Sequence, residues 1–385
     1  MKISLKRTPE QIELIKAMAS KNRDVAYEAQ VALAAFLGPV LAEVINNAPV
    51  LSNLFSPLSF NSEDNPSIPL DLYYDITDED YITIYSQQVA GGLPTNQVLP
   101  TTSEMKITTY RLDSALSFDK RYAAKSRMDV VSKTFTRMAQ EILAKQERTS
   151  GNLILSSLAA AVTNNKKHVQ RANAVGRFLL QDMNELLTLS RRVFTSFTGG
   201  TMPTGQAGMG VTDLIISPEI EEELRAMAYN PINTKGVMDR AVTTITDSGI
   251  TAPDSVRAGL FNGGGISSFY GVNLMVFNEF GLTRKFNTIF DTVATNTSFA
   301  TANGTTLNAA FDGDKDELLL GINRNRESLI RAIAVDSETG SEFSLVADDQ
   351  YSIRQNKIGY FGSLEEGRMV LDNRALFGKI VRWTA

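Results

Sequence analysis

The sequence predicts a mixed α+β protein, and three of its features lead to this fold class. Residues 8–45 and 126–151 have the periodicity of helices, residues 81–85 and 105–109 alternate like strands, and short β-forming segments follow residue 328. The chain has 385 residues, of which 43% are hydrophobic and 21% are charged. This composition is typical of a globular protein and excludes global disorder, and the length allows two domains.

Cysteine is absent and His168 is the only histidine, which excludes several kinds of chemistry. Disulfides, thiol nucleophiles, Cys/His zinc sites and histidine-based catalytic triads are all ruled out. We therefore expect no cofactor and no metal bound through these residues.

No targeting segment is expected at the N-terminus, because no apolar core follows the basic start. The most apolar stretch, residues 31–45, holds Gly38, Pro39 and Glu43 and is too short to span a bilayer. We expect a soluble protein that has no contact with a membrane and is cytoplasmic when made.

The first element is a helical arm over residues 8–45. Thr8 is a plausible N-cap, with Pro9 at the first helical position. Gly38-Pro39 interrupts the pattern, so we expect two helices or a kink there. Residues 46–69 contain several prolines and predict an extended connector.

A long β-hairpin is expected over residues 70–118, because the period changes to two. Its tip, residues 81–103, contains no Asp, Glu, Lys or Arg, and its glycines and prolines forbid regular structure. Each arm of about fifteen residues would reach on the order of 50 Å. Such a two-stranded ribbon is not stable alone in water.

The strongest helix is predicted over residues 126–151, where Gly151 weakens or ends it. An apolar run follows at 152–162 and a second helical stripe at 175–197. The stripe of the strongest helix repeats at steps of three and four residues and consists of Met128, Val131, Phe135, Met138 and Ile142.

The remainder of the chain has an α/β pattern. Residues 211–217 predict a buried strand, after which Ser217 and Pro218 signal the start of a helix. Residues 295–314 are rich in Thr and Asn, and we expect them to form a polar loop. Further strands are expected at 269–277, 328–335, 342–346, 357–362, 368–372 and 376–383.

No catalytic or metal-binding pattern is complete, so we expect a protein that is not an enzyme. Asp312, Asp314 and Asp316 have calcium-loop spacing, but Glu317 replaces the turn-making Gly and Asn323 the bidentate Glu. The run Gly200–Gly205 is followed by Gln206 in place of the P-loop lysine, and 261–268 lacks the dinucleotide-binding spacing. His168 lies in a basic polar run and is expected at the surface.

Charge is unevenly distributed. Residues 119–192 hold 14 Lys/Arg and 6 Asp/Glu, a balance of +8, whereas the whole chain has a net charge of −5. One basic segment inside an acidic protein indicates two faces with different neighbours, or a chance enrichment on helix surfaces.

The order of these parts resembles the major capsid proteins of tailed double-stranded DNA bacteriophages, whose architecture is called the HK97 fold. The likeness covers the whole chain and rests on residues 115–147, 212–227, 267–281 and 367–383. It implies an N-terminal arm and connector (1–65), an E-loop hairpin (66–118), a spine helix and peripheral domain (119–205, with C-terminal strands from about 340–385) and an axial domain (206–340).

The resemblance implies hexamers and pentamers of the chain in an icosahedral shell around DNA. In this family the E-loop lies across the adjacent subunit. Burying its apolar side chains would contribute on the order of 10 kcal/mol, whereas ordering about twenty backbone positions costs about 1–2 kcal/mol each. The tip therefore needs a neighbour, and its expected contact residues are Ile82, Ile84, Tyr85, Val89, Leu93, Val98 and Leu99.

In relatives the spine helix and peripheral domain line the inner wall. The basic residues there would face packaged DNA without sequence preference. The resemblance assigns this role to Lys120, Arg121, Lys125, Arg127, Lys133, Arg137, Lys166, Lys167 and Arg171.

Some relatives join subunits through an E-loop lysine, but residues 81–103 contain none, so no covalent bond is expected. Separate scaffolding, portal and decoration proteins are possible partners, and the virion is the expected location, after assembly in the host cytoplasm. The alternatives are an encapsulin-type nanocompartment, a soluble α/β enzyme, and a fibre or adhesin protein.

Overall fold

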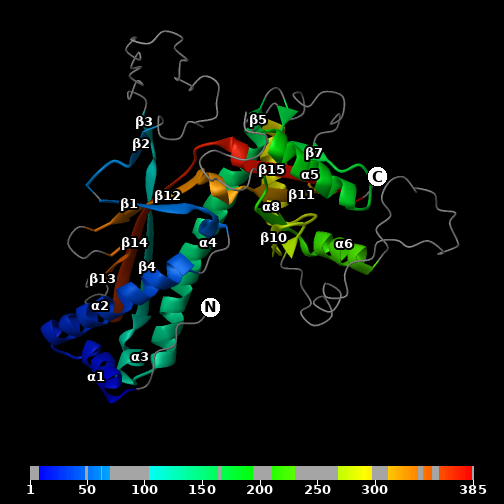
Figure 1. Ribbon diagram of the computed structural model, residues 1–385. Coiled ribbons are helices and arrows are strands. Elements are labelled where there is room, and N and C mark those ends of the chain that lie inside the picture. The colour runs from blue at the N-terminus through cyan, green and yellow to red at the C-terminus, as the bar shows by residue number, and fades with distance from the viewer. Residues whose placement is uncertain are drawn as a thin grey trace, which may run out of the picture. The chain divides into compact units, whose positions relative to one another are not determined.

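The computed structural model describes residues 8–47, 51–61, 63–69, 104–163, 166–193, 210–229, 268–296, 311–336, 341–348 and 355–383. Its elements form two compact units (Figure 1). With the gaps just given, unit 1 comprises residues 8–69, 104–151 and 329–371, and unit 2 comprises 152–328 and 372–383. Both contain helices and strands, which confirms the predicted α+β class.

The N-terminal arm of unit 1 consists of two helices, α1 (Pro9–Met18) and α2 (Arg23–Asn47). Thr8 caps α1 as predicted, since its hydroxyl accepts a hydrogen bond from the Gln11 N–H at 3.3 Å. A break in the arm is therefore present, but it falls between residues 18 and 23.

The predicted division into two helices at Gly38-Pro39 is wrong, because α2 continues through Pro39. The proline removes one backbone hydrogen bond from the helix. Leu37 and Leu41 on either side of it are buried in the core of unit 1. Their packing stabilises the helix where its local sequence does not.

The sheet of unit 1 has the order β1-β12-β14-β13. Strands β12 and β13 both pair with one edge of β14, and β4 pairs with its other edge. Two strands predicted separately at 357–362 and 368–372 are one continuous strand, β14. The bounds are β1 (Ser56–Asn61), β4 (Thr109–Asp119), β12 (Leu329–Val335), β13 (Ser344–Asp348) and β14 (Lys357–Val370).

The predicted hairpin over 70–118 is wrong for residues 109–118, which do not pair with the other hairpin arm in the described residues. β4 pairs antiparallel with β14 along its whole length, from Thr109↔Gly367 to Asp119↔Lys357, so it belongs to the sheet. The hairpin is described only at its stem, where β2 (Ser67–Pro69) pairs with β3 (Glu104–Lys106). Residues 70–103 lie outside the described residues.

Helices α3 (Lys120–Ala124) and α4 (Met128–Ala160) follow the sheet. The five residues of the predicted α4 stripe are all buried. At Gly362 of β14, a Cβ would lie 2.5 Å from Phe343 Cζ and 2.8 Å from Met138 Cε of α4. A side chain at this position would therefore force Phe343 and Met138 to shift, and glycine lets both pack directly on the strand.

The prediction that α4 ends at Gly151 is wrong, because the helix continues to Ala160. Ile154, Leu155 and Leu158 in its last third are buried. This packing outweighs the cost of one glycine inside a helix, which is about 1 kcal/mol relative to alanine.

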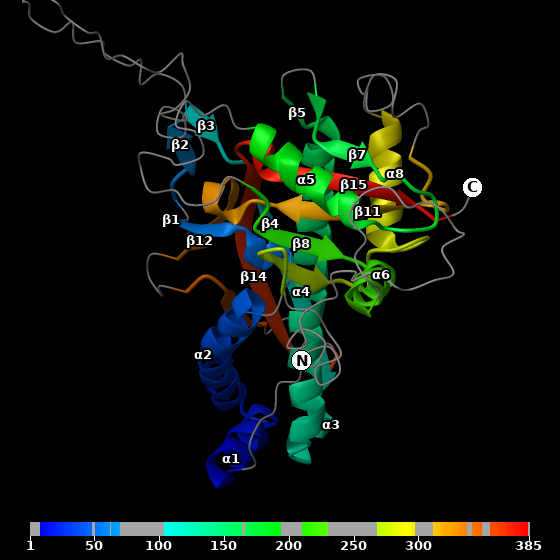
Figure 2. The same cartoon turned by 45° about the vertical axis from the view of Figure 1, so that its right-hand side comes forward.

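Unit 2 contains a six-stranded sheet of order β7-β15-β11-β8-β10-β9 (Figure 2). Its central strand β11 and helix α8 are not predicted from the sequence. The bounds are β7 (Val169–Arg171), β8 (Asp213–Ile216), β9 (Ser268–Phe269), β10 (Val272–Val276), β11 (Asp316–Ile322), β15 (Leu376–Arg382), α5 (Leu180–Arg192), α6 (Pro218–Tyr229) and α8 (Lys285–Asn296).

The predicted start of α6 is confirmed, with Pro218 at its first position and the Ser217 hydroxyl accepting from the Ile220 N–H at 3.1 Å. Side chains of α5 and α6 share one hydrophobic core with β8, β11 and β15. Small elements complete the described chain: β5 (Val162–Thr163), β6 (Lys166–Lys167) and 3-10 turns at Ser52–Leu54, Arg324–Arg326 and Asn373–Ala375.

Candidate functional site

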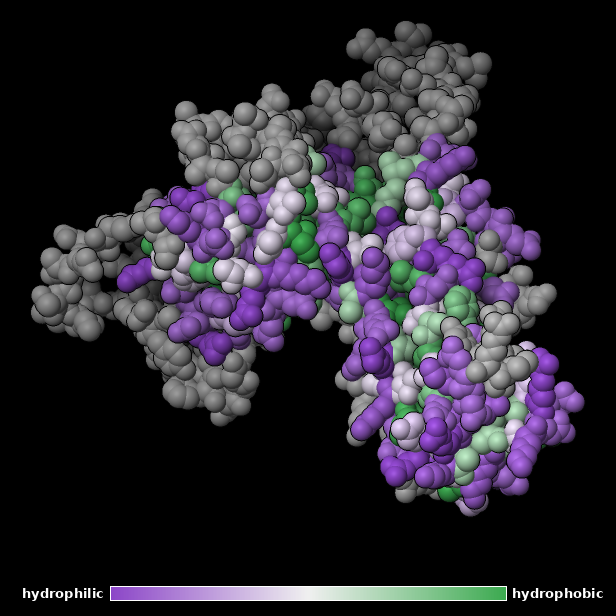
Figure 3. Space-filling model, turned by 180° about the vertical axis from the view of Figure 1, so that it is seen from behind, coloured by the Kyte–Doolittle hydropathy of each residue, from purple (hydrophilic) through white to green (hydrophobic). Residues whose placement is uncertain are grey.

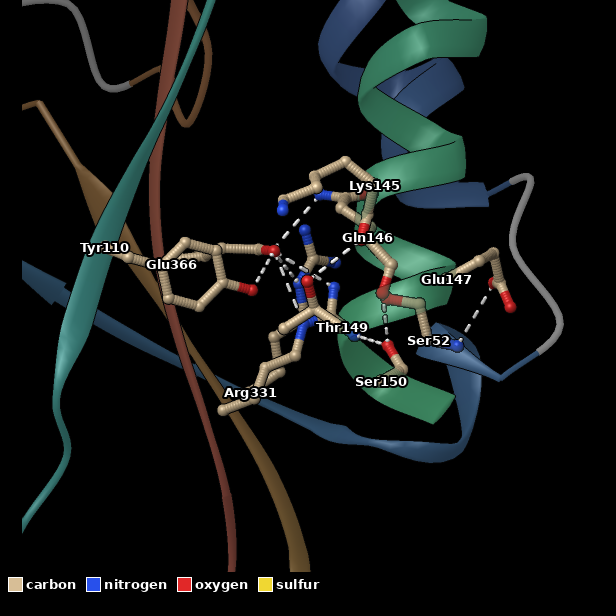
Figure 4. A network of polar contacts seen from close by, with 10 residues as sticks. Ser52, Tyr110, Lys145, Gln146, Glu147, Thr149, Ser150, Arg331 and Glu366 are labelled. Carbon is tan, nitrogen blue, oxygen red and sulfur yellow. Dashed lines mark hydrogen bonds and ion pairs between the residues drawn. The ribbon is translucent and has the colours of Figure 1, made fainter. Parts of the chain in front are cut away.

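The most extensive polar network of the described residues surrounds Glu366, inside unit 1. Figure 4 shows side chains from β4, β12, β14 and α4 converging on this carboxylate. Glu366 Oε1 accepts from the Tyr110 hydroxyl at 2.7 Å. Glu366 Oε2 accepts from Arg331 Nε at 2.9 Å and from Gln146 Nε2 at 3.1 Å. Arg368 contacts both oxygens, with Nη2–O distances of 3.2 and 3.1 Å.

This network holds one carboxylate and two guanidinium groups away from water. Burial raises the pKa of Glu366, but Arg368 and Arg331 outweigh it and hold that pKa below its usual range. Burial also raises the pKa of the Tyr110 hydroxyl, as does the adjacent Glu366 charge. Glu366 is therefore ionised and Tyr110 neutral at neutral pH.

The network connects segments that are distant in the sequence. Arg368 Nη1 also donates to the Ser150 hydroxyl of α4, and its guanidinium lies 5.4 Å from the ring centroid of Phe55. All of its charged side chains are buried. Because each charge is neutralised or hydrogen-bonded inside the protein, the arrangement serves to hold β4, β12, β14 and α4 together.

Two smaller charged clusters lie in unit 2. Asp316 of β11 binds Arg171 at 2.9 Å and Arg382 at 2.7 Å. Lys379 of β15, which is fully buried, binds Glu185 at 2.7 Å and lies 3.5 Å from Asp182.

The described residues contain no group of three or more His, Asp and Glu side chains that could hold a metal ion. The calcium-like spacing at residues 312–316 does not produce one, because Asp316 faces two arginines and the Asp312 carboxylate accepts from the Asp314 N–H. The carboxylates of Asp312 and Asp316 are thus used within the protein.

The predicted basic residues do not all present a cation at the surface. Lys125, Arg127 and Lys133 are exposed, Arg121 pairs with Asp119 and Arg137 with Glu141. Lys120 is half-buried, and Lys166 is placed in β6 without a described side chain.

Two members of that basic set are corrected by the structure. Lys167 is buried, and its ammonium group lies 3.4 Å from the Ala159 carbonyl. Arg171 is occupied by Asp316. Neither side chain is a free surface cation, because the strands that carry them are packed into unit 2.

The expectation that His168 lies at the surface is also wrong, since this side chain is fully buried. Its Nδ1 lies 3.0 Å from the Leu376 carbonyl and 3.2 Å from that of Asn373. Carbonyl oxygens only accept, so Nδ1 carries the proton. Burial lowers the pKa of His168, and the imidazole stacks on Phe377 as part of the core.

The seven predicted contact residues of the hairpin tip, from Ile82 to Leu99, lie outside the described residues. The stem β2–β3 shows where both ends of that segment leave unit 1. Their role in contacts between subunits stays a prediction.

Exposed apolar side chains on α2, on both flanks of its buried face, are a feature that the sequence analysis misses. By length and composition, α2 is the one described helix that could cross a membrane over Arg23–Ile45, and 44% of its apolar window is buried in the protein. On the face seen in Figure 3, by contrast, hydrophilic side chains dominate and hydrophobic ones form separate patches. The exposed apolar residues of α2 are Val25, Tyr27, Val31, Phe36 and Val40.

A signal for that feature is present in the sequence. Between residues 25 and 42, Glu28 is the only charged residue, whereas a helix with one side in water has a polar face. The low charge of this stretch therefore agrees with the exposed apolar side chains of α2.

Comparisons with known proteins find no matching family model and no matching curated protein. Similar solved structures are mostly phage capsids, together with an encapsulin and a virus-like particle. The capsid of cyanophage P-SCSP1u is 12% identical and covers 88% of this chain and 89% of its own, with a TM-score of 0.48.

Two further similar structures come from other sources. The one described as Microbacterium phage Oxtober96 is 11% identical, covers 88% of this chain and 91% of its own, and has a TM-score of 0.47. The encapsulin of Synechococcus elongatus is 14% identical, covers 74% of this chain and 78% of its own, and has a TM-score of 0.39.

Proposed function

We propose that this chain is the shell subunit of an icosahedral phage head, in which copies form hexamers and pentamers around double-stranded DNA. The role is structural and not enzymatic. In this proposal the chain resides in the virion after assembly in the host cytoplasm, and scaffolding, portal and decoration proteins are separate partners.

The observation that carries the proposal is the hairpin stem of unit 1. Strands β2 and β3 hold both ends of residues 70–103, and the uncharged run 81–103 lies within that segment. Desolvating a charge on docking is costly without a matched partner, so an uncharged tip suits a surface that becomes buried. The exposed apolar side chains of α2 agree with the same view, because a lone chain leaves them in water.

Electron microscopy of the purified full chain tests the proposal, and closed shells of uniform size are expected. Replacing Val98 and Leu99 with lysine should abolish the shells, because two charges would be buried at the subunit contact. Far-UV circular dichroism should remain that of the folded chain. Ser156→Lys on the exposed side of α4 is the control and should still give shells.

Two results would contradict this reading. The first is a wild-type chain that stays monomeric under every assembly condition, and the second is a tip variant that assembles normally. Shells that contain protein cargo and a low ratio of absorbance at 260 to 280 nm would instead indicate a nanocompartment.

Subunits of the shell should not be covalently joined, because residues 81–103 contain no lysine to form an isopeptide bond. Boiling assembled particles in SDS should release a single band near the chain mass of 42.2 kDa. A ladder of dimers and higher multimers would contradict this expectation.

The basic side of α3 and α4 is proposed to face the packaged DNA. Lys133, Arg137, Lys145 and Arg148 are exposed and recur on one side of α4. Their contacts would be to phosphates and independent of base sequence.

Weak DNA binding that falls steeply with salt is therefore expected. Replacing Lys125, Arg127 and Lys133 with glutamine should reduce the slope of log affinity against log salt by about one unit for each phosphate group that the variant no longer neutralises. Lys285→Gln in unit 2 is the control. Tight, sequence-selective binding by the purified chain would overturn the assignment.

A further inference from the structure

Glu317 of β11 is a buried carboxyl group in unit 2 that no ion pair in the described chain neutralises. The side chain is fully buried, and its Oε2 accepts a hydrogen bond from the Trp383 indole N–H at 2.5 Å. The Ser217 hydroxyl also bonds to this carboxyl group. Its other oxygen, Oε1, has no partner among the described residues.

The charged groups around this carboxyl do not offset its charge. From α6, Glu219 adds a repulsive negative charge, and Glu221 is paired with Arg225. Glu317 pairs with Val381 of β15, and Lys379 lies two residues before Val381. The Lys379 ammonium group is bound by Glu185 and lies near Asp182.

No ion pair between Glu317 and an arginine is present among the described residues. Arg382 of β15 binds Asp316, and Arg284 flanks Gly281 beside Glu219. The hydrogen bonds from Trp383 and Ser217 favour the anion, but burial outweighs them and Glu219 opposes them. Burial therefore raises the pKa of Glu317 to about 7.

We propose that Glu317 and Trp383 form a proton-dependent latch, which holds the end of β15 on β11 while Glu317 is protonated and loosens when the proton is lost. This buried site can hold Glu317 as a neutral carboxyl group at little cost. A carboxylate needs further hydrogen-bond donors, and water is the available source because the described donors to the group are one indole and one hydroxyl.

The end of β15 is the part of the sheet that lies beside Glu317. Glu317 pairs with Val381, one rung from the terminal pair Asp316↔Arg382. Beyond that rung, the Trp383 N–H donates to the Lys315 carbonyl at 3.0 Å. Opening this terminus breaks the Asp316–Arg382 ion pair and the bond from the Gly176 N–H to the Arg382 carbonyl, whereas the centre of β11 is paired with strands on both sides.

The direction of the pH effect follows from the raised pKa. The folded state holds the Glu317 proton up to pH of about 7, whereas the unfolded chain loses it near the ordinary glutamate pKa of 4.5. The stabilisation is therefore complete below pH 4.5, declines as the pH rises towards 7, and is absent above it. The Asp316–Arg382 pair does not add to this change, because the pKa of Asp316 is lowered by its two arginines, which outweigh the opposing effect of burial.

Trp383 is the only tryptophan of the chain and reports on the latch directly. Acrylamide quenching of its fluorescence, measured on the full chain from pH 5 to 9, should increase with a midpoint near pH 7. Amide exchange at Arg382 and Trp383, corrected for its intrinsic pH dependence, should accelerate over the same range, while Phe377 stays protected.

Glu317→Gln should remove the transition and keep Trp383 protected at all pH values. Glu219→Gln should move the midpoint to lower pH, because it removes a repulsive charge, and exposed Glu222→Gln should leave the midpoint unchanged. A wild-type chain whose Trp383 accessibility is constant with pH, or a Glu317→Gln variant with the same transition, would overturn the proposal. The test does not depend on whether the chain forms shells.

Discussion

Replacing Glu366 with alanine should lower the free energy of unfolding of unit 1 by about 3–5 kcal/mol. The change leaves Arg331 and Arg368 buried without an anion and removes the acceptor for Tyr110 and Gln146. Losing one partner of a buried pair costs more than the pair contributes as a whole, because the remaining charge stays desolvated.

Neighbouring Glu365→Gln is the matched control, since Glu365 lies on the same strand, is half-buried and accepts one bond from Thr109 at 3.0 Å. It should cost about 1 kcal/mol or less. Urea unfolding followed by far-UV circular dichroism measures both variants. If Glu366→Ala costs no more than the control, the network does not hold unit 1 together.

Glu366→Gln should also change the acid stability of the protein. The folded-state pKa of Glu366 lies below its usual range, so the wild type retains this contribution at neutral pH and loses it as the pH falls below the ordinary glutamate pKa of 4.5. The variant should lack that part of the acid-side slope. An identical slope in both would mean that Glu366 does not titrate in this range.

The parts of the fold that depend on local sequence are the ones predicted correctly. The cap at Thr8, the start of α6 at Ser217-Pro218 and the buried stripe of α4 all rest on residues within a few positions of one another. Such signals act through backbone hydrogen bonds and helix periodicity, which can be recognised in the sequence without knowledge of tertiary contacts.

The errors arise where tertiary packing overrides those local signals. Pro39 and Gly151 are helix breakers by propensity, yet both lie inside helices whose flanking apolar residues are buried. His168 and Lys167 look like surface residues in a basic run, but the strands that follow them place both in the core of unit 2.

The polar networks could not be predicted, because their members are dispersed along the chain. Glu366 contacts Tyr110, Gln146 and Arg331, which are 256, 220 and 35 positions away. No spacing rule relates such residues. The register of β4 and β12 on β14 brings Tyr110 and Arg331 to Glu366, and the packing of α4 on the sheet brings Gln146.

Replacing Lys379 with methionine should destabilise unit 2 by about 3 kcal/mol, the lower end for a broken buried pair. The ammonium group binds Glu185 and lies near buried Asp182 at the start of α5. Methionine fills a similar volume, so the loss is mainly electrostatic. Asp182 keeps its bonds from the N–H groups of Asn173 and Leu179, and partly exposed Glu185 can turn to water, which limits the cost.

Trp383, which packs beside the same core, reports the unfolding of unit 2 by its fluorescence. Exposed Lys285→Met on α8 is the control and should change the stability by no more than about 0.5 kcal/mol. Adding Asp182→Asn to Lys379→Met should recover part of the loss, because it removes the stranded negative charge. The asparagine carbonyl keeps an acceptor for one of the two N–H groups, Asn173 or Leu179, which bond to different oxygens of Asp182 and of which the other is lost, so the recovery is incomplete. A double variant as unstable as the sum of both changes would show that Lys379 and Asp182 do not interact, and that the ammonium group is held by Glu185 alone.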